Sequence, residues 1–190
     1  MKKLIIIIAL FLYCNNHVHA QVVVTLEQYG EYKMNDKKGA PDEIDYIKDV
    51  NNVLGKYVGT WKGVYNNLNY EIRFMKYTDH SILDIDMLLM RYKITKNGVV
   101  VEDTTTLPDE ASGIIKGDYL QKNTYVLNYM GKELHCGQMG NIYIGLVNKT
   151  DLTKIKLFLV PTSEMIVTNL CPNGIVAPVF PETSFVLTKQ

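Results

Sequence analysis

The fold is decided by a stretch that alternates in character, Tyr70-Glu71-Ile72-Arg73-Phe74. Successive side chains of a β-strand point to opposite faces, so this stretch places its three apolar side chains on one face and its two charged side chains on the other. It therefore predicts a strand with one buried face and one face in water. The same two-residue period recurs along the chain from Lys56 onward.

Further short strands are expected on both sides of this stretch. They are predicted around Trp61 and at 83–87, 88–94, 99–101, 114–119, 125–130, 142–146, 155–159 and 184–189. Tight turns separate them, with Asn66-Asn67 and Asn97-Gly98 as the clearest hairpin signals. Between Met87 and Leu89 the apolar phase slips by one residue, which predicts a β-bulge or a sharp bend there.

The predicted fold class is all-β, with about eight strands and one short N-terminal helix. Consecutive strands without intervening helices indicate an antiparallel meander, and a meander of this size hides its edges by closing. We therefore expect an up-and-down barrel, or a strongly curved half-barrel, at residues 41–190. Its helix is predicted at 41–54, where Pro41 and the acidic Asp42 and Glu43 suit a first turn and Gly55 suits a stop. Residues 21–40 are expected to be a flexible leader or an added edge strand.

The first twenty residues have the features of a secretion signal. Lys2 and Lys3 precede an apolar run of about ten residues, and small residues lead to Ala20, so we expect cleavage between Ala20 and Gln21. The run is too short for a spanning helix, and no later segment is longer. A lipidated Cys14 is the alternative, but bulky Tyr13 precedes it. The mature chain of 170 residues is thus expected in the periplasm or outside the cell.

Removal of the signal leaves two cysteines, Cys136 and Cys171. In an exported protein two thiols are most simply one disulfide, although two separate buried thiols remain an alternative. Closing a loop of 35 residues would contribute about 4 kcal/mol in the chain-entropy model. A zinc site is disfavoured, because His80 and His135 are the only histidines left and no paired-ligand spacing occurs.

The charge balance argues against polyanionic partners. The mature chain keeps 18 basic and 20 acidic residues, a formal charge of −2. Nucleic-acid binding therefore has no compositional support. No cofactor motif is recognisable either.

The segment Gly59-Thr60-Trp61 resembles the Gly-x-Trp pattern that opens the first barrel strand of lipocalins. This resemblance implies that Trp61, the only tryptophan, closes one end of a barrel with its indole nitrogen hydrogen-bonded. Lipocalins also tend to carry a basic partner for this tryptophan on a late strand. Lys189 is the nearest candidate here.

The whole chain also resembles an uncharacterised family of small exported proteins from Bacteroidota. The shared features are the signal peptide, the segment Gly59 to Gly63, the cysteines Cys136 and Cys171, and the terminus Leu187 to Gln190. The resemblance implies export and an all-β fold. That family has no assigned activity to transfer.

The candidate ligand-binding residues lie on the predicted strands. They combine apolar bodies with the polar tips of tyrosines, which suits a pocket for a small amphipathic molecule, although the same residues are normal in a barrel core. The residues are Trp61, Tyr65, Tyr70, Ile72, Phe74, Tyr125, Leu127 and Tyr129.

Two patterns contain residue types found in catalytic sites, and each also suits a structural role. Asp84 and Asp86 share one face of a strand, about 7 Å apart, as a metal or acid–base pair would require, but they also suit a solvated outer face. His135 and Cys136 are adjacent on a strand and therefore point to opposite faces. We accordingly expect no enzymatic activity.

Three functions are compatible with these features. The first is a non-enzymatic exported barrel that binds a small lipophilic or amphipathic ligand. The second is a protein-interaction or structural module of the cell envelope. The third is a hydrolase that uses Asp84 and Asp86.

Overall fold

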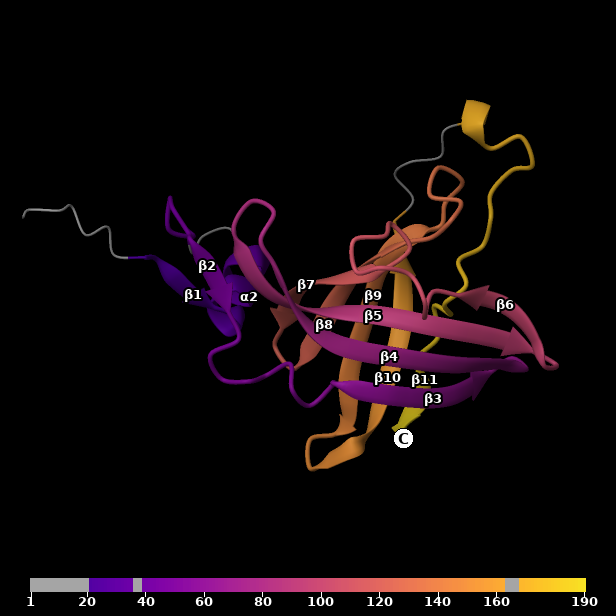
Figure 1. Ribbon diagram of the computed structural model, residues 1–190, viewed down its shortest axis with the longest axis horizontal. Coiled ribbons are helices and arrows are strands. Elements are labelled where there is room, and N and C mark those ends of the chain that lie inside the picture. Colours follow the sequence, from indigo (N-terminus) through magenta and orange to yellow (C-terminus); the bar gives the residue numbers. More distant parts are fainter. Residues whose placement is uncertain (1–20, 36–38, 163–167) are drawn as a thin grey trace, which may run out of the picture.

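The computed structural model describes residues 21–35, 39–162 and 168–190. The expected signal peptide, with Cys14 and Ala20, lies outside the described residues. Figure 1 shows the elements. They are β1 (Val23–Thr25), α2 (Leu26–Met34), β2 (Tyr46–Lys48), β3 (Gly59–Tyr65), β4 (Leu68–Asp79), β5 (Asp84–Lys96), β6 (Val99–Asp103), β7 (Ile115–Gln121), β8 (Thr124–Met130), β9 (Met139–Asn148), β10 (Asp151–Pro161), the 3₁₀ helix η1 (Thr168–Leu170) and β11 (Phe185–Lys189).

Eight of the strands form a closed antiparallel barrel. The hydrogen-bonded order is β5-β4-β3-β11-β10-β9-β8-β7, and a further pairing of β7 with β5 completes the ring. Each of these strands pairs with its neighbour along the chain, except that β6 stands between β5 and β7 and pairs with β5. The predicted meander is confirmed, and of the two expected forms the closed barrel is the one present.

The ring closes where the last strand meets the first. Thr188 pairs with Lys62 and Lys189 with Trp61 in antiparallel register. The backbone N–H of Gln190 donates to the Thr60 carbonyl at 2.9 Å. The Lys189 ammonium lies 5.2 Å from the centre of the Trp61 ring, within the range of a cation–π interaction. The expected pairing of Lys189 with Trp61 is thus present.

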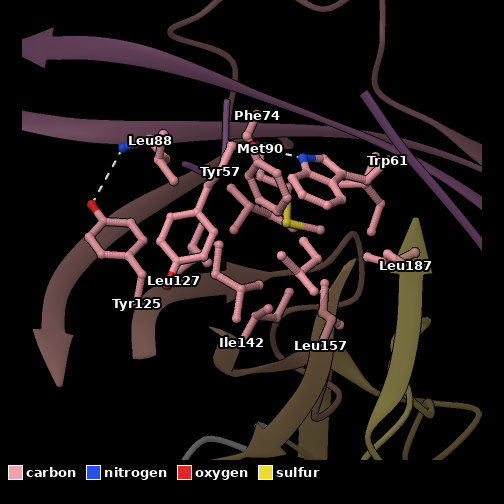
Figure 2. Packing of buried hydrophobic residues seen from close by; sticks show 14 of the residues in the cluster. Tyr57, Trp61, Phe74, Leu88, Met90, Tyr125, Leu127, Ile142, Leu157 and Leu187 are labelled. Atoms are coloured by element: carbon pink, nitrogen blue, oxygen red, sulfur yellow. Dashed lines mark hydrogen bonds between the residues drawn. The ribbon is translucent and has the colours of Figure 1, made fainter. Parts of the chain in front are cut away.

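The inward-facing side chains fill the barrel with one continuous apolar core. Tyr70, Ile72 and Phe74 are at most 2% exposed, as their alternation with Glu71 and Arg73 predicts. Figure 2 shows how residues from β3, β4, β5, β8, β9, β10 and β11 meet in this core. The cluster includes Trp61, Leu88, Met90, Tyr125, Leu127, Ile142, Ile144, Ile155, Leu157 and Leu187.

The bulge predicted between Met87 and Leu89 is wrong for the β4–β5 ladder. The register runs without a shift from Leu68 opposite Lys96 to Asp79 opposite Ile85. The apolar phase changes because β5 is covered on both faces in this region. The outward-pointing Arg91, for example, donates a hydrogen bond to the Leu107 carbonyl, so the loop after β6 lies over that face.

The position predicted for the helix is also wrong. The helix is α2, at Leu26–Met34, where Thr25 and Gln28 form a reciprocal capping box. The segment predicted to be helical instead contains β2, in which buried Ile47 pairs in parallel with Val24 and with Ile85. The pairing of β2 with β1 on one side and with β5 on the other outweighs the helix-start signals of residues 41–54. For residues 21–40 two interpretations were open, and the added edge strand is present as β1.

The N-terminal elements cover one end of the barrel, as Figure 1 shows for β1, β2 and α2. Leu26 of α2 and Leu54 and Tyr57 of the following turns belong to the core cluster and are fully buried. Helix α2 rests against β7 so closely that a Cβ added to Gly30 would collide with the Leu120 carbonyl oxygen. We call this end the closed end.

Gly30→Ala therefore tests the docking of α2. We expect a loss of about 2 kcal/mol in the free energy of unfolding from the collision with backbone, which outweighs the gain of about 1 kcal/mol in helix propensity. Urea unfolding of the purified chain measures it. Gly39→Ala is the control, since nothing lies within 4 Å of a Cβ placed there. Equal stability of the two variants would contradict this packing.

Candidate functional site

The opposite end of the barrel, here called the mouth, is lined by aromatic side chains. Tyr65 ends β3, Tyr70 and Tyr92 lie on β4 and β5, Tyr129 lies on β8, and Phe185 begins β11. The Phe185 ring centre lies 4.8 Å from that of Tyr70 and 5.8 Å from that of Tyr65. The mouth thus presents apolar rings with several phenolic hydroxyls among them.

A segment without helix or strand, residues 171–184, crosses the mouth; we call it the strap. It begins at the disulfide between Cys136 and Cys171, whose Cα atoms are 5.4 Å apart. The Val176 N–H donates to the Cys136 carbonyl at 2.8 Å, and the Gln138 amide donates to the Ala177 carbonyl at 2.9 Å. The predicted disulfide is confirmed as the bond that ties the strap to the β8–β9 loop.

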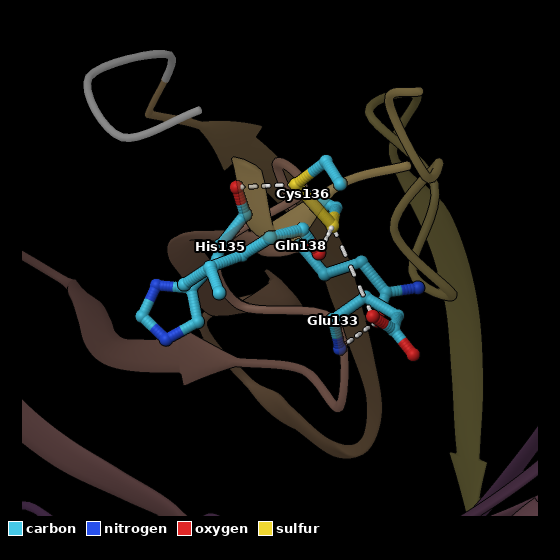
Figure 3. The surroundings of a disulfide bond; sticks show 6 residues. Glu133, His135, Cys136 and Gln138 are labelled. Carbon is cyan, nitrogen blue, oxygen red and sulfur yellow. Dashed lines mark hydrogen bonds between the residues drawn. A yellow bond between two sulfur atoms is a disulfide. The ribbon is translucent and has the colours of Figure 1, made fainter. Parts of the chain in front are cut away.

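The surroundings of the disulfide are structural in character. Figure 3 shows Glu133, His135 and Gln138 around it, with the His135 ring directed away from the sulfur atoms. Gln138, 6% exposed, also accepts a hydrogen bond from the Glu133 N–H at 3.0 Å. Hence the loop and the strap are held together by one covalent bond and a small hydrogen-bond network.

Phe180 of the strap points into the mouth and is 2% exposed. Its ring meets those of Tyr92 and Tyr129 edge-on, at centre-to-centre distances of 4.9 Å and 5.5 Å. The Tyr70 ring lies 6.1 Å away. Edge-to-face contacts at these distances are favourable beyond the burial of area. Phe180 therefore occupies an aromatic cage that the barrel strands provide.

The strap backbone next to Phe180 uses two of the phenolic hydroxyls. The Tyr70 hydroxyl donates to the Val179 carbonyl at 3.0 Å, and the Tyr129 hydroxyl accepts from the Val179 N–H at 3.5 Å. The N–H and the C=O of Val179 are thus both satisfied by the barrel. A polar ligand group in the same place would find one donor and one acceptor.

A buried carboxylate lies beside the cage. Glu102 of β6 is 7% exposed and accepts a hydrogen bond from the Tyr92 hydroxyl at 2.8 Å. The ammonium of Lys132 lies 4.0 Å from the same carboxylate oxygen. A charge so well buried persists only when it is paired, so Tyr92 and Lys132 are needed to hold it.

The mouth shifts the ionisation of its tyrosines. Burial raises the pKa of Tyr70 to about 12 and that of Tyr129 to about 12, against an ordinary value of 10. The pKa of Tyr92 is raised further, by burial first and then by the charge of Glu102. All three are neutral hydrogen-bonding groups at physiological pH.

The predicted ligand residues divide between the two halves of the barrel. Tyr65, Tyr70 and Tyr129 are at the mouth. The other five pack within the core, where each is fully buried; they are Trp61, Ile72, Phe74, Tyr125 and Leu127. A role of any of these eight residues in binding remains a prediction.

Trp61 and Tyr125 have their polar atoms satisfied inside the barrel. The indole N–H of Trp61 donates to the Tyr57 carbonyl at 2.7 Å, as expected for a tryptophan that closes a barrel end. The Tyr125 hydroxyl accepts from the Leu88 N–H at 3.4 Å (Figure 2). Their surroundings are those of a packed core.

The sequence prediction missed Phe180 and Glu102. Phe180 stands between Pro178 and Pro181, in a segment with no alternation that would have marked it as buried. Glu102 resembles any exposed charge at a strand end. Only the closing of the barrel brings these residues to the cage.

Asp84 and Asp86, the predicted acidic pair, have different hydrogen-bond partners. Asp86 accepts hydrogen bonds from the Tyr46 hydroxyl at 2.9 Å, the Asp49 N–H at 2.9 Å and the Thr78 hydroxyl at 2.8 Å. Burial raises the pKa of Asp86, but these hydrogen bonds outweigh it and leave the pKa below its ordinary value. Asp84 instead lies 2.7 Å from the ring nitrogen of His80.

This arrangement does not favour the hydrolase hypothesis. A general acid for glycoside cleavage needs a raised pKa, whereas that of Asp86 is lowered. The hydrogen bonds show what Asp86 does instead: those from Tyr46 and Asp49 join β2 and the following turn to the barrel, and that from Thr78 joins β4 to β5.

In residues 21–35, 39–162 and 168–190, no three His, Cys, Asp or Glu side chains gather as metal ligands would. Among these same residues, no helix has both the length and the apolar character needed to cross a membrane.

The chain belongs to a family of unknown function, DUF6705, whose model matches residues 1–160. No curated protein and no solved structure matches the chain. The expectation that the chain belongs to an uncharacterised family is confirmed. Export remains a prediction. The function must therefore be argued from the mouth itself.

The raised tyrosine pKa values predict a fall in stability at alkaline pH. Below pH 10 these tyrosines are neutral in the folded and in the unfolded chain, so their contribution to the free energy of unfolding is fully present. Between pH 10 and 12 the unfolded chain loses tyrosine protons that the folded chain keeps, and the free energy of unfolding therefore falls. Urea unfolding as a function of pH measures it. Tyr70→Phe should make the fall shallower. Constant stability from pH 10 to 12 would contradict the burial of these hydroxyls.

Proposed function

We propose that this protein is a non-enzymatic carrier that binds one small apolar or amphipathic molecule at the barrel mouth. The observation that carries the proposal is the aromatic cage of Tyr70, Tyr92 and Tyr129, which holds a single side chain, Phe180, from the strap. In this proposal Phe180 is an internal plug that a ligand displaces.

The cage suggests the chemistry of the ligand. The place of Phe180 is suited to a flat, apolar ring or a short hydrocarbon group, because tyrosine rings surround it. The places of the Val179 C=O and N–H are suited to one hydrogen-bond acceptor and one donor of a ligand, which the Tyr70 and Tyr129 hydroxyls would satisfy. A small apolar molecule with one amide or hydroxyl group meets both requirements.

The construction of the strap supports displacement. Between η1 and β11 its 14 residues form no helix or strand, so displacement of Phe180 would break individual hydrogen bonds, those of Val179 and the one from the Leu159 N–H to the Pro181 carbonyl, and no strand ladder. The disulfide keeps its first residue beside the mouth whatever the rest does. The strap could leave the cage and return without separating from the barrel.

The resemblance of Gly59-Thr60-Trp61 to lipocalins and the signal-like first twenty residues support the same proposal. Lipocalin-like barrels bind their ligands in the end opposite the conserved tryptophan. Here Trp61 lies toward the closed end, and the cage lies at the mouth. The predicted export places such a carrier where ligands cross aqueous space.

Phe180→Ala tests the plug. We expect the variant to bind a fluorescent fatty-acid analogue about tenfold or more tightly than the unmodified chain, since no side chain must first be displaced. It should also lose about 3–5 kcal/mol of stability, as large-to-small core substitutions do. Fluorescence titration and urea unfolding measure the two effects.

The matched control is Phe158→Ala. Phe158 stacks on Tyr143, with ring centres 5.1 Å apart, on an outward-facing position of β10. It should leave binding of the analogue unchanged. If Phe180→Ala fails to fold, the milder Phe180→Leu takes its place. Affinity that is equal in the Phe180 and Phe158 variants would contradict the carrier.

A second function, a protein-interaction module, is favoured by the exposed strand β6. Its residues Val99, Val100 and Val101 are 70%, 48% and 49% exposed. Among the described strands β6 pairs with β5 alone, so its other edge is open to an added strand. A partner that docks by β-augmentation would cover both the edge and the valines.

Val100→Lys should abolish such docking, because it places a charge on the open strand. The measurement is capture of proteins from an envelope extract by the immobilised chain. Val160→Lys, at a 44% exposed valine of β10, is the control and should capture the same proteins as the unmodified chain. Unchanged capture by Val100→Lys would exclude β6 as the docking site.

A further inference from the structure

Three lysines gather around one cavity at the closed end, far from the mouth. The cavity has a volume of about 460 Å³ and is lined by Lys56, Lys149 and Lys156 together with Thr124, Gly145 and neighbouring apolar residues. Among the described residues, no aspartate or glutamate lines it. The three lysines come from the turn before β3, the β9–β10 turn and β10, so only the folded barrel brings them together.

The described lysines divide into those that form an ion pair with a carboxylate and those that do not. Lys33, Lys62, Lys76, Lys93 and Lys116 each form an ion pair with a carboxylate. In the part of the chain that the structure describes, none of the three cavity lysines does so, which is also true of Lys96 and Lys154; what sets the three apart is that they line one cavity.

Lys56 is the most enclosed of the three lysines. Its ammonium lies 5.0 Å from the centre of the Tyr57 ring. Burial lowers the pKa of Lys56, against weaker opposing effects of Glu27 and Asp49. The Asp49 carboxylate already forms an ion pair with Lys76, whose Nζ lies 2.6 Å from Asp49 Oδ2. The lining of the cavity therefore carries three lysine charges, with Glu27 and Asp49 as the nearby carboxylates that act on Lys56.

The other lining groups suit a phosphate carried on an apolar molecule. Thr124 offers a hydroxyl beside Gly145, whose lack of a side chain leaves the cavity floor open; a Cβ there would lie 3.5 Å from the Thr124 hydroxyl oxygen. Val147 and Leu152, 49% and 50% exposed, form an apolar border. Lysines bind phosphate as point charges, and a hydroxyl adds a directed hydrogen bond.

We propose that this cavity is a binding site for a phosphate group borne by an apolar molecule. Lys56, Lys149 and Lys156 neutralise the phosphate, Thr124 donates a hydrogen bond to it, and Val147 and Leu152 contact the apolar part. The site lies at the opposite end of the barrel from the cage. The proposal for this site therefore does not depend on the proposed carrier function.

The test uses the double variant Lys149→Gln and Lys156→Gln, which removes two exposed charges without touching the core. Binding is measured by calorimetry with inorganic phosphate, and by co-sedimentation with phosphatidylcholine vesicles that contain or lack phosphatidic acid. We expect the unmodified chain to bind at least one of the phosphate probes and the double variant to bind it about tenfold more weakly.

The control is the double variant Lys96→Gln and Lys154→Gln, which makes the same charge change at exposed lysines outside the cavity. It should bind like the unmodified chain. Binding of inorganic phosphate would indicate a soluble phosphorylated compound, and binding of phosphatidic acid vesicles alone would indicate a lipid headgroup; both support the site. Absence of binding to either probe, or an equal loss in the control, would overturn the proposal.

Discussion

The pairing of β11 with β3 is the interaction on which the rest of the structure depends. It joins the last strand of the barrel to the first through two residue pairs, Thr188 with Lys62 and Lys189 with Trp61. Without it the sheet would have two free edges and its apolar face would open to water. Lys189 strengthens this seam by lying over the Trp61 ring, and the φ of +129° at Gly59 is accessible to a residue without a Cβ.

The two ends of this barrel are closed by different means. The closed end is covered by α2, β2 and the turns up to Tyr57, whose side chains belong to the core cluster. The mouth is covered by the strap, which inserts one ring, Phe180, and is held by the Cys136–Cys171 disulfide and a few hydrogen bonds. In the chain-entropy model the disulfide contributes about 4 kcal/mol. This contrast is why the mouth is the candidate ligand site.

The errors of sequence interpretation have identifiable physical causes. Residues 41–54 carry helix-start signals, but Ile47 gains sheet partners on both sides, and such contacts are not encoded locally. The phase change near Leu88 indicated a bulge, whereas a strand buried on both faces produces the same pattern. The true helix start, Thr25 with Gln28, was present in the sequence as a capping-box pattern.

The sequence by itself determined the strands of the barrel, their antiparallel order and the disulfide partners, because alternation, turn residues and the count of cysteines are local or countable properties. It also identified three residues of the mouth, Tyr65, Tyr70 and Tyr129. Only the tertiary structure decided that Phe180 fills the cage and that three lysines share a cavity. These arrangements depend on residues far apart in the chain, such as Tyr70 and Val179, which are separated by 109 positions, and no periodicity relates such distant positions until the barrel closes.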